Sequence, residues 1–296
     1  MRHLLVLLLT ALIALPAAAW GQKGHYLANE AATYAVPYEL PRFFHEAYPG
    51  LVYLGYDPDR LHGAGESADD MFANDHFLDY EYVASLTLPR GRYAFLALLE
   101  TSGVLRANLI DNRTVGFLPW RIAETCEHLE RQWQLWKRAA DPSDRRQIEQ
   151  NIIYLSGVLG HFAGDAANPH HATIHYNGWV GEKNPEGFRT DCDAHARFES
   201  IFVTRNVAIG DVVPLMQPAT RRDDYFAAAL DFVRESQSLV PALYRLDRDG
   251  AFDDAGNEAG KRFAAGRIAT GASWLRDLWW SAYLNGTQGR PGKERR

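Results

Sequence analysis

Cysteine, long apolar runs and positive charge are all scarce in this chain, and the scarcity of each excludes a class of protein. It holds only two cysteines, Cys126 and Cys192, in 296 residues, which excludes a disulfide framework and leaves room for at most one bridge. After residue 19 no run approaches the ~20 apolar residues of a membrane-spanning helix. Positive charge is also scarce, because 31 Lys and Arg face 37 Asp and Glu for a net charge of −6. A protein that holds nucleic acid by electrostatics alone needs the opposite sign.

The amino terminus carries the one strongly apolar block. Arg2 precedes an apolar run from Leu4 to Leu15, and three alanines end the block before Trp20. This order of charge, apolar core and small residues is typical of a secretory signal peptide. We expect a mature protein that begins at Trp20, carries 30 basic against 37 acidic side chains (net charge −7), and is secreted or periplasmic. The expected domains are a signal peptide at 1–19, one large domain at 20–288 and a polar tail at 289–296.

Apolar periodicity in the rest of the chain predicts helices. A hydrophobic content of 47% with 8 Trp is enough for a sizeable core. Apolar residues recur three and four apart, which predicts helices at 24–36, 92–110, 120–140, 145–167, 193–207, 223–246 and 259–284. Residues 37–65 look irregular, and the one short strand signal is at 77–83. The predicted fold is an all-α, single-domain, multi-helix bundle.

Two polar side chains interrupt an otherwise apolar helical segment. His161 and Asp165 are four residues apart, which places them one turn apart on one helical face. An isolated buried charge is costly unless it is paired or binds a metal, so the alternatives are a structural His–Asp pair and a metal site. His195 and Glu199 repeat the same spacing, and a turn at Pro169 can aim a further histidine at the same place. Imidazole and carboxylate ligands of this kind favour zinc.

Three further motifs precede this segment along the chain. They are Trp20-Gly-Gln-Lys-Gly-His25, Tyr56-Asp57-Pro58-Asp59-Arg60-Leu61-His62 and Asn74-Asp75-His76-Phe77-Leu78-Asp79. With His161-x-x-x-Asp165-x5-His171 and His195-x-x-x-Glu199, the ordered set resembles the trinuclear-zinc superfamily. That superfamily contains the single-strand-specific zinc nucleases and bacterial zinc-dependent phospholipase C. The similarity runs from Trp20 to Glu199, and any one motif alone is weak.

The resemblance implies three zinc ions and a definite set of ligands. Trp20 would bind through its freed α-amino nitrogen and its carbonyl oxygen, so the site would assemble only after the signal peptide is removed. Asp165 would bridge two ions. The implied ligands are Trp20, His25 and Asp165 for the first ion, Asp59, His76, His161 and Asp165 for the second, and His171, His195 and Glu199 for the third.

Several assignments stay open at the level of sequence. Asp57 is the alternative to Asp59, since both lie in an Asp-Pro turn motif, and His170 competes with His171, although the six-residue step from Asp165 favours His171. Acidic residues near the motifs are candidates to accept the second ring N–H of a ligand histidine; these are Asp75, Asp79, Asp191 and Asp193. Five histidines match no family position, namely His3, His45, His62, His128 and His175.

The resemblance implies a zinc-dependent hydrolase of phosphoric esters. Zinc lowers the pKa of a bound water to about 7, and Asp59 is the residue expected to orient or deprotonate the nucleophile. The preferred substrate is single-stranded nucleic acid or a 3′-nucleotide, with Phe77 stacking on a base and Asp79 bonding its edge. The alternative substrate is a phosphatidylcholine-type head group, and a third hypothesis is a secreted scaffold that has lost catalysis. The protein is expected to be a monomer without an obligate protein partner.

Overall fold

The computed structural model describes residues 20–184, 186–254 and 256–290. The expected signal peptide and most of the polar tail lie outside these residues. The described part contains helices, two isolated β-bridges and no strand, which confirms the predicted all-α bundle. None of its helices is both long and apolar enough to cross a membrane. Both cysteines are free, Cys126 in the core and Cys192 on the surface.

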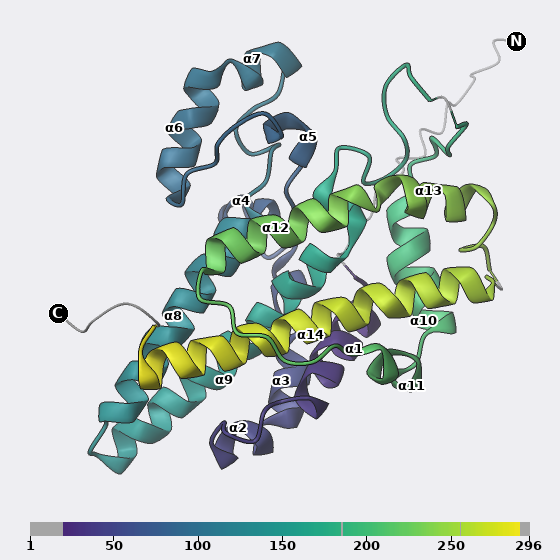
Figure 1. The fold of residues 1–296 in the computed structure, drawn as a ribbon. Coiled ribbons are helices and arrows are strands. Elements are labelled where there is room, and N and C mark those ends of the chain that lie inside the picture. The colour runs from purple at the N-terminus through teal and green to yellow at the C-terminus, as the bar shows by residue number, and fades with distance from the viewer. Residues whose placement is uncertain (1–19, 185, 255, 291–296) are drawn as a thin grey trace, which may run out of the picture.

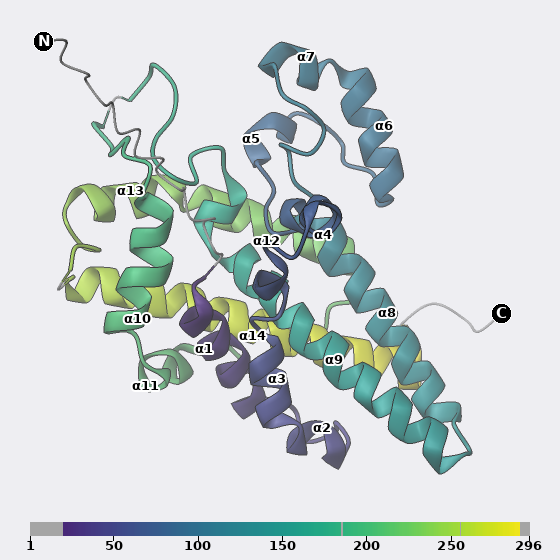
Figure 2. The same cartoon turned by 180° about the vertical axis from the view of Figure 1, so that it is seen from behind.

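Five helices build the body of the bundle (Figures 1 and 2). The long α14 crosses the whole molecule and packs against α1, α8 and α9, while α12 packs on α8 and α9. Their bounds are α1 Gln22–Tyr34, α8 Leu118–Arg138, α9 Pro142–Ala167, α12 Tyr225–Ser238 and α14 Glu258–Gln288.

Short helices make up most of the remainder. In both views α6 and α7 lie to one side of the bundle, beyond α8. The short elements are α2 Arg42–Glu46, α3 Tyr48–Leu54, η1 Pro58–Leu61, α4 Glu66–Phe72, η2 Ala73–Asp75, α5 Tyr80–Val83, α6 Arg92–Ser102, α7 Val104–Asn108, η3 Pro169–Ala172, the π-helical η4 Ala196–Phe202, α10 Val203–Asn206, α11 Ile209–Val212, η5 Val213–Leu215 and α13 Val240–Arg248.

Local sequence sets both ends of α9. The Asp141 side chain caps its first turn by accepting hydrogen bonds from the backbone N–H groups of Ser143 (2.7 Å) and Asp144 (3.2 Å). Pro169 ends it, because the residue before a proline is driven out of helical geometry; Asn168 accordingly has φ −84° and ψ 119°. The chain therefore turns sharply into η3, directly after Asp165.

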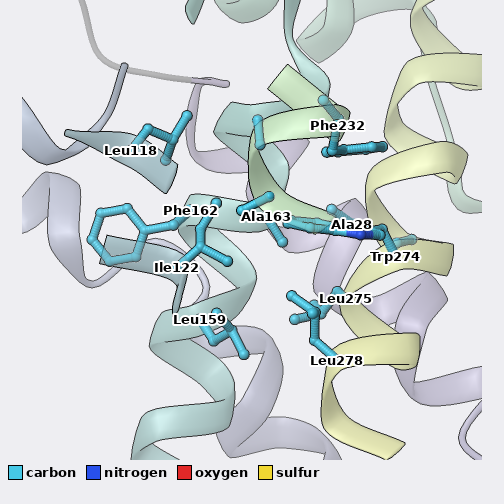
Figure 3. Close-up of a cluster of buried hydrophobic side chains, with 14 of the residues drawn as sticks. Ala28, Leu118, Ile122, Leu159, Phe162, Ala163, Phe232, Trp274, Leu275 and Leu278 are labelled. Carbon is cyan, nitrogen blue, oxygen red and sulfur yellow. The ribbon is translucent and has the colours of Figure 1, made fainter. Parts of the chain in front are cut away.

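Apolar side chains from α1, α8, α9, α12 and α14 meet in one main core (Figure 3). Leu159 and Phe162 of α9 lie beside Ile122 of α8, and Leu275 and Leu278 of α14 lie on the opposite side. All five are at most 1% exposed. This core fixes the positions of the helices that carry the polar motifs.

Glycines of α9 allow α1 to come unusually close. A Cβ at Gly160 would stand 2.0 Å from Oδ1 of Asn29, and one at Gly164 would stand 3.1 Å from Nδ1 of His25. Asn29 also donates to the backbone carbonyl of Gly157 at 3.1 Å. The close approach of the two helices brings His25 beside the segment that carries His161 and Asp165.

The structure corrects several predicted elements. Residues 77–83 form no strand: Leu78 N–H donates to the His171 carbonyl and Asp79 N–H to the Val115 carbonyl, each at 2.9 Å, and α5 follows. The helix predicted at 92–110 breaks at Gly103, where φ is +81°. The 223–246 helix is two helices, α12 and α13, and the 37–65 region contains α2, α3 and η1. The 193–207 helix is π-helical in its middle, over the residues of η4, and continues as α10.

Candidate metal centre

The predicted histidines and carboxylates converge on one buried region from six parts of the chain. α1 supplies His25, η1 supplies Asp59, and the residue after η2 is His76. The remaining five come from α9, η3 and the start of the π-helical η4. All eight side chains are at most 6% exposed, namely His25, Asp59, His76, His161, Asp165, His171, His195 and Glu199.

The first cluster gathers around Nε2 of His161. Its distances are 2.9 Å to Nδ1 of His76, 3.3 Å to Oδ2 of Asp165 and 3.5 Å to Oδ1 of Asp59. The Nε2 atom of His25 lies 3.6 Å from Oδ1 of Asp165 and 4.0 Å from Oδ2 of Asp59. Tetrahedral zinc with bonds near 2.0–2.1 Å separates its ligand atoms by roughly 3.3 Å, so most of these separations suit shared ions.

The second cluster comprises His171, His195 and Glu199. Nε2 of His171 and Nε2 of His195 are 3.0 Å apart. Oε2 of Glu199 lies 2.7 Å from Nε2 of His195 and 3.6 Å from Nε2 of His171. Each of the three side chains offers one ligand atom, and these atoms all lie within 4.8 Å of one another. The cluster depends on the turn at Pro169, which carries His171 towards η4.

Several buried polar atoms in the two clusters have no hydrogen-bond partner among the described residues. They include both ring nitrogens of His25, both oxygens of Asp59, Oδ1 of Asp165 and Oε1 of Glu199. A buried polar group without a partner costs about 1–3 kcal/mol, and more when it is charged. Metal ions would satisfy these atoms, so the donor set fits zinc better than it fits an apolar core.

Burial and neighbouring charges shift the pKa values of side chains in both clusters. Burial acts to lower the pKa of His161, but the carboxylates of Asp165 and Asp59 outweigh burial and raise this pKa to about 9. Burial, assisted by the charge of His161, lowers the pKa of His25 to about 3. In the second cluster burial raises the pKa of Glu199 to about 8. The carboxylates of Asp165 and Asp59 therefore favour the positively charged form of His161.

Backbone carbonyls orient two of the imidazoles. Nδ1 of His161 lies 3.0 Å from the Gly55 carbonyl, and Nδ1 of His171 lies 2.7 Å from the His76 carbonyl. A carbonyl oxygen can only accept, so each Nδ1 carries a proton, and each Nε2 is the ring nitrogen that could offer a lone pair to a metal ion.

The acidic residues predicted for this orienting role do something else. Asp75 pairs with Arg92 and Arg121, and both Asp191 and Asp193 pair with Arg197. The side chain of Asp79 makes no hydrogen bond to a ligand histidine. For Asp75, Asp191 and Asp193 the prediction was wrong because their carboxylates pair with arginines instead.

Asn168 is a supporting residue that sequence reasoning missed. Its side-chain amide donates to Oε2 of Glu199 at 2.9 Å, and its oxygen accepts from the backbone N–H of His170 at 3.1 Å. Asn168 is fully buried. Its place between Asp165 and the Pro169 turn was the only signal in the sequence.

The paired candidates Asp57 and Asp59, and His170 and His171, differ in what they contact. Asp59 belongs to the first cluster, whereas Asp57 pairs with Arg60 at 3.3 Å, outside it. His171 belongs to the second cluster, and His170 is buried beside it without belonging to it. Trp20 is 1% exposed, and its indole N–H donates to the Gly164 carbonyl at 2.7 Å, one residue before Asp165.

A cavity of about 380 Å³ opens onto both clusters. Phe77, which is half-buried, and Asp79, which is 7% exposed, are the two residues expected to bind substrate, and both line this cavity. Burial raises the pKa of Asp79 to about 8, with a further contribution from Glu81. The lining residues are His62, Ala73, His76, Phe77, Asp79, Thr114, His170, His171, Tyr176 and His195. His62 was not expected there.

Comparisons with known proteins add little to this geometry. No protein-family model and no curated protein matches the chain. Among solved structures, the chain is similar to the alpha-toxin of Clostridium perfringens from avian strain SWCP, with a TM-score of 0.48, 13% identity and 94% of this chain covered. It is also similar to the alpha toxin of Clostridium absonum, with a TM-score of 0.46, 11% identity and 88% covered. The matches span 66% and 64% of the two toxins. Similarities at this level carry no argument about family or activity, so the site's own chemistry is what points to a function.

Proposed function

We propose that the chain is a zinc-dependent hydrolase of phosphoric esters, exported and active as a monomer, with three zinc ions. The observation that carries the proposal is the set of buried imidazole and carboxylate atoms without hydrogen-bond partners in two adjoining clusters. The first cluster, completed by the backbone of Trp20, would hold two ions with Asp165 between them. The second cluster would hold the third ion. Both clusters border one cavity large enough for a phosphoester group.

Bound zinc would supply a water of lowered pKa and positive charge for the phosphoryl oxygens. The protein's own residues would then position the reactants. Asp59 is assigned to orient the attacking water, because neither of its carboxylate oxygens has a hydrogen-bond partner among the residues that the structure describes. The carbonyls of Gly55 and His76 hold the imidazoles of His161 and His171 in one tautomer.

The cavity wall favours a phospholipid head group of the phosphatidylcholine type over the nucleic acid that we first expected. Among the described residues no Lys or Arg lines the cavity, and the expected mature charge of −7 repels a polyanion. Phe77, Tyr176 and Asp79 instead offer two aromatic rings and a carboxyl group. That combination suits a quaternary ammonium, which binds over aromatic faces.

Single-strand nuclease or 3′-nucleotidase activity remains the second candidate. Its support is that Phe77 and Asp79 line the same cavity, as a stacking ring and an edge-binding acid would require. A single base needs no basic groove when metal ions neutralise its phosphate.

The proposal is tested with protein that begins at Trp20, assayed on phosphatidylcholine vesicles and on single-stranded oligonucleotide, each with and without a zinc chelator. We expect chelator-sensitive release of phosphocholine at a rate at least tenfold above that on the oligonucleotide. Cleavage of the oligonucleotide alone would reverse the substrate assignment and keep the hydrolase. Zinc-loaded protein that turns over neither substrate nor a generic phosphodiester would support the scaffold hypothesis and overturn the proposal.

A further inference from the structure

His62 faces the first cluster because of the helix type that precedes it. Residues 58–61 form the 3₁₀-helix η1, and His62 caps it with its backbone N–H on the Asp59 carbonyl at 3.2 Å. A 3₁₀-helix has 3.0 residues per turn, so side chains three apart eclipse each other. Asp59 and His62 therefore point the same way, towards the cavity.

The geometry around Asp59 places His62 within reach of an ion. Nε2 of His62 lies 3.6 Å from Oδ1 of Asp59, and Nδ1 of His76 lies 3.8 Å from the same oxygen. The rings of His62 and His76 are 5.1 Å apart. The three side chains offer ligand atoms that all lie within 4.8 Å of one another. Together with His161 and Asp165, the other ligands expected of this ion, His62 would supply a fifth protein donor, and zinc at catalytic sites sometimes becomes five-coordinate.

The surroundings leave His62 available for this role. Its neighbour Arg60 turns away, donating to the Tyr26 hydroxyl at 2.8 Å and the Tyr53 carbonyl at 3.2 Å. The His62 side chain is 22% exposed, whereas that of Asp59 is fully buried. His62 is thus a partly exposed residue of the cavity lining, whereas Asp59 and His161 are buried and do not line the cavity.

We propose that His62 is an additional protein ligand of the zinc ion held by Asp59 and His76. The inference rests on the proposed function, because it requires zinc at Asp59, but it adds a ligand that the family resemblance does not supply. Because His62 lines the cavity and Asp59 does not, its imidazole would add a protein donor on the cavity side and slow the loss of this ion to solvent.

Direct detection of metal–nitrogen bonds tests the ligand. Protein beginning at Trp20, labelled with the NMR-active nitrogen isotope in histidine and loaded with NMR-active cadmium, shows metal–nitrogen coupling at every coordinated ring. We expect six coupled histidines, namely His25, His62, His76, His161, His171 and His195. Five coupled rings would refute the His62 ligand and leave the proposed function intact. A protein that takes up no metal would instead overturn the proposed function.

Two variants assign the sixth signal. In H62Q one coupling disappears, and cobalt(II) titrated as the probe binds at least tenfold more weakly at one site with an altered visible spectrum. Gln retains a hydrogen-bond donor for Asp59, so unchanged cobalt affinity in H62Q would show a purely orienting role and refute the proposal. His45 is exposed on α2, and H45Q is expected to keep all six couplings. The number of coupled histidines is measured in the unmutated protein, so it tests the proposal even if H62Q folds poorly.

Discussion

Asn168 connects the two halves of the metal centre through one buried amide. It lies between Asp165 of the first cluster and His171 of the second, and it donates to Glu199 at 2.9 Å. Loss of such a supporting contact typically weakens metal binding 10–100-fold. We therefore expect Asn168→Ala to lower zinc affinity about tenfold at one site, measured by competition with a chromophoric chelator.

The matched control for this prediction is Asn151→Ala. Asn151 lies on the same helix, α9, but is exposed and makes only a weak contact with Gln132 at 3.5 Å. Its removal should leave all zinc affinities unchanged. Equal affinities in the Asn168 and Asn151 variants would show that the amide does not support Glu199.

Asp79 should give the folded protein a distinctive pH dependence. Burial raises its pKa from an ordinary 3.8 to about 8 in the folded state, so between these values the unfolded chain has lost a proton that the folded chain keeps. Stability from this group is therefore fully present at low pH and falls as the pH rises through the window, by at most about 1.4 kcal/mol per unit.

Asp79→Asn removes that dependence, because the amide stays neutral. We expect the free energy of unfolding of the variant, relative to the original protein, to rise steadily from pH 5 to pH 8, measured by urea denaturation at matched zinc concentrations. The difference cancels ionisations that both proteins share. A difference that stays flat with pH would mean that Asp79 is ionised in the folded state.

The pair Asp59 and His62 could not be predicted from the sequence. A spacing of four predicts one face of an α-helix, and it pairs His161 with Asp165 and His195 with Glu199. A spacing of three is equally significant in a 3₁₀-helix, but nothing in the local sequence announces that helix type. The sequence therefore predicts no metal-binding role for His62, which matches no family position.

Helices with long amphipathic patterns were predictable, and short ones were not. The helices expected at 120–140, 145–167 and 259–284 correspond to α8, α9 and α14 within a few residues. Residues 77–83 were misjudged because aromatic and branched side chains favour strands, while their backbone is held instead by the carbonyls of Val115 and His171. Such long-range contacts leave no periodic signal in the sequence.

The close packing of α1 against α9 depends on Gly160. A methyl group there would stand 2.0 Å from Oδ1 of Asn29, and overpacking of this kind costs about 1–3 kcal/mol. We expect Gly160→Ala to lower the free energy of unfolding by that amount in urea denaturation.

Gly266→Ala is the control for this packing prediction. Gly266 lies in α14, and a Cβ there would meet nothing within 4 Å. Alanine in an open helical position is favoured over glycine by about 0.5–1 kcal/mol, so this variant should be slightly more stable. Destabilisation of the two variants to the same degree would contradict the close approach of α1 and α9.

Export and assembly of the metal centre are linked if the backbone of Trp20 is a ligand. The Trp20 indole is buried against the segment that carries Asp165. We expect protein that begins at Trp20 to bind one more zinc ion than the same protein with Ala19 retained, because an amide nitrogen does not replace a free amine. Equal zinc content in the two proteins would exclude the amine as a ligand.

The proposed hydrolase needs zinc in the buried clusters, and elemental analysis measures that zinc. Protein that begins at Trp20 is dialysed against metal-free buffer and its bound zinc is counted per chain. We expect three ions, and about two in Glu199→Ala, which removes a ligand of the second cluster. Less than one ion per chain, with the fold intact, would contradict the proposed function.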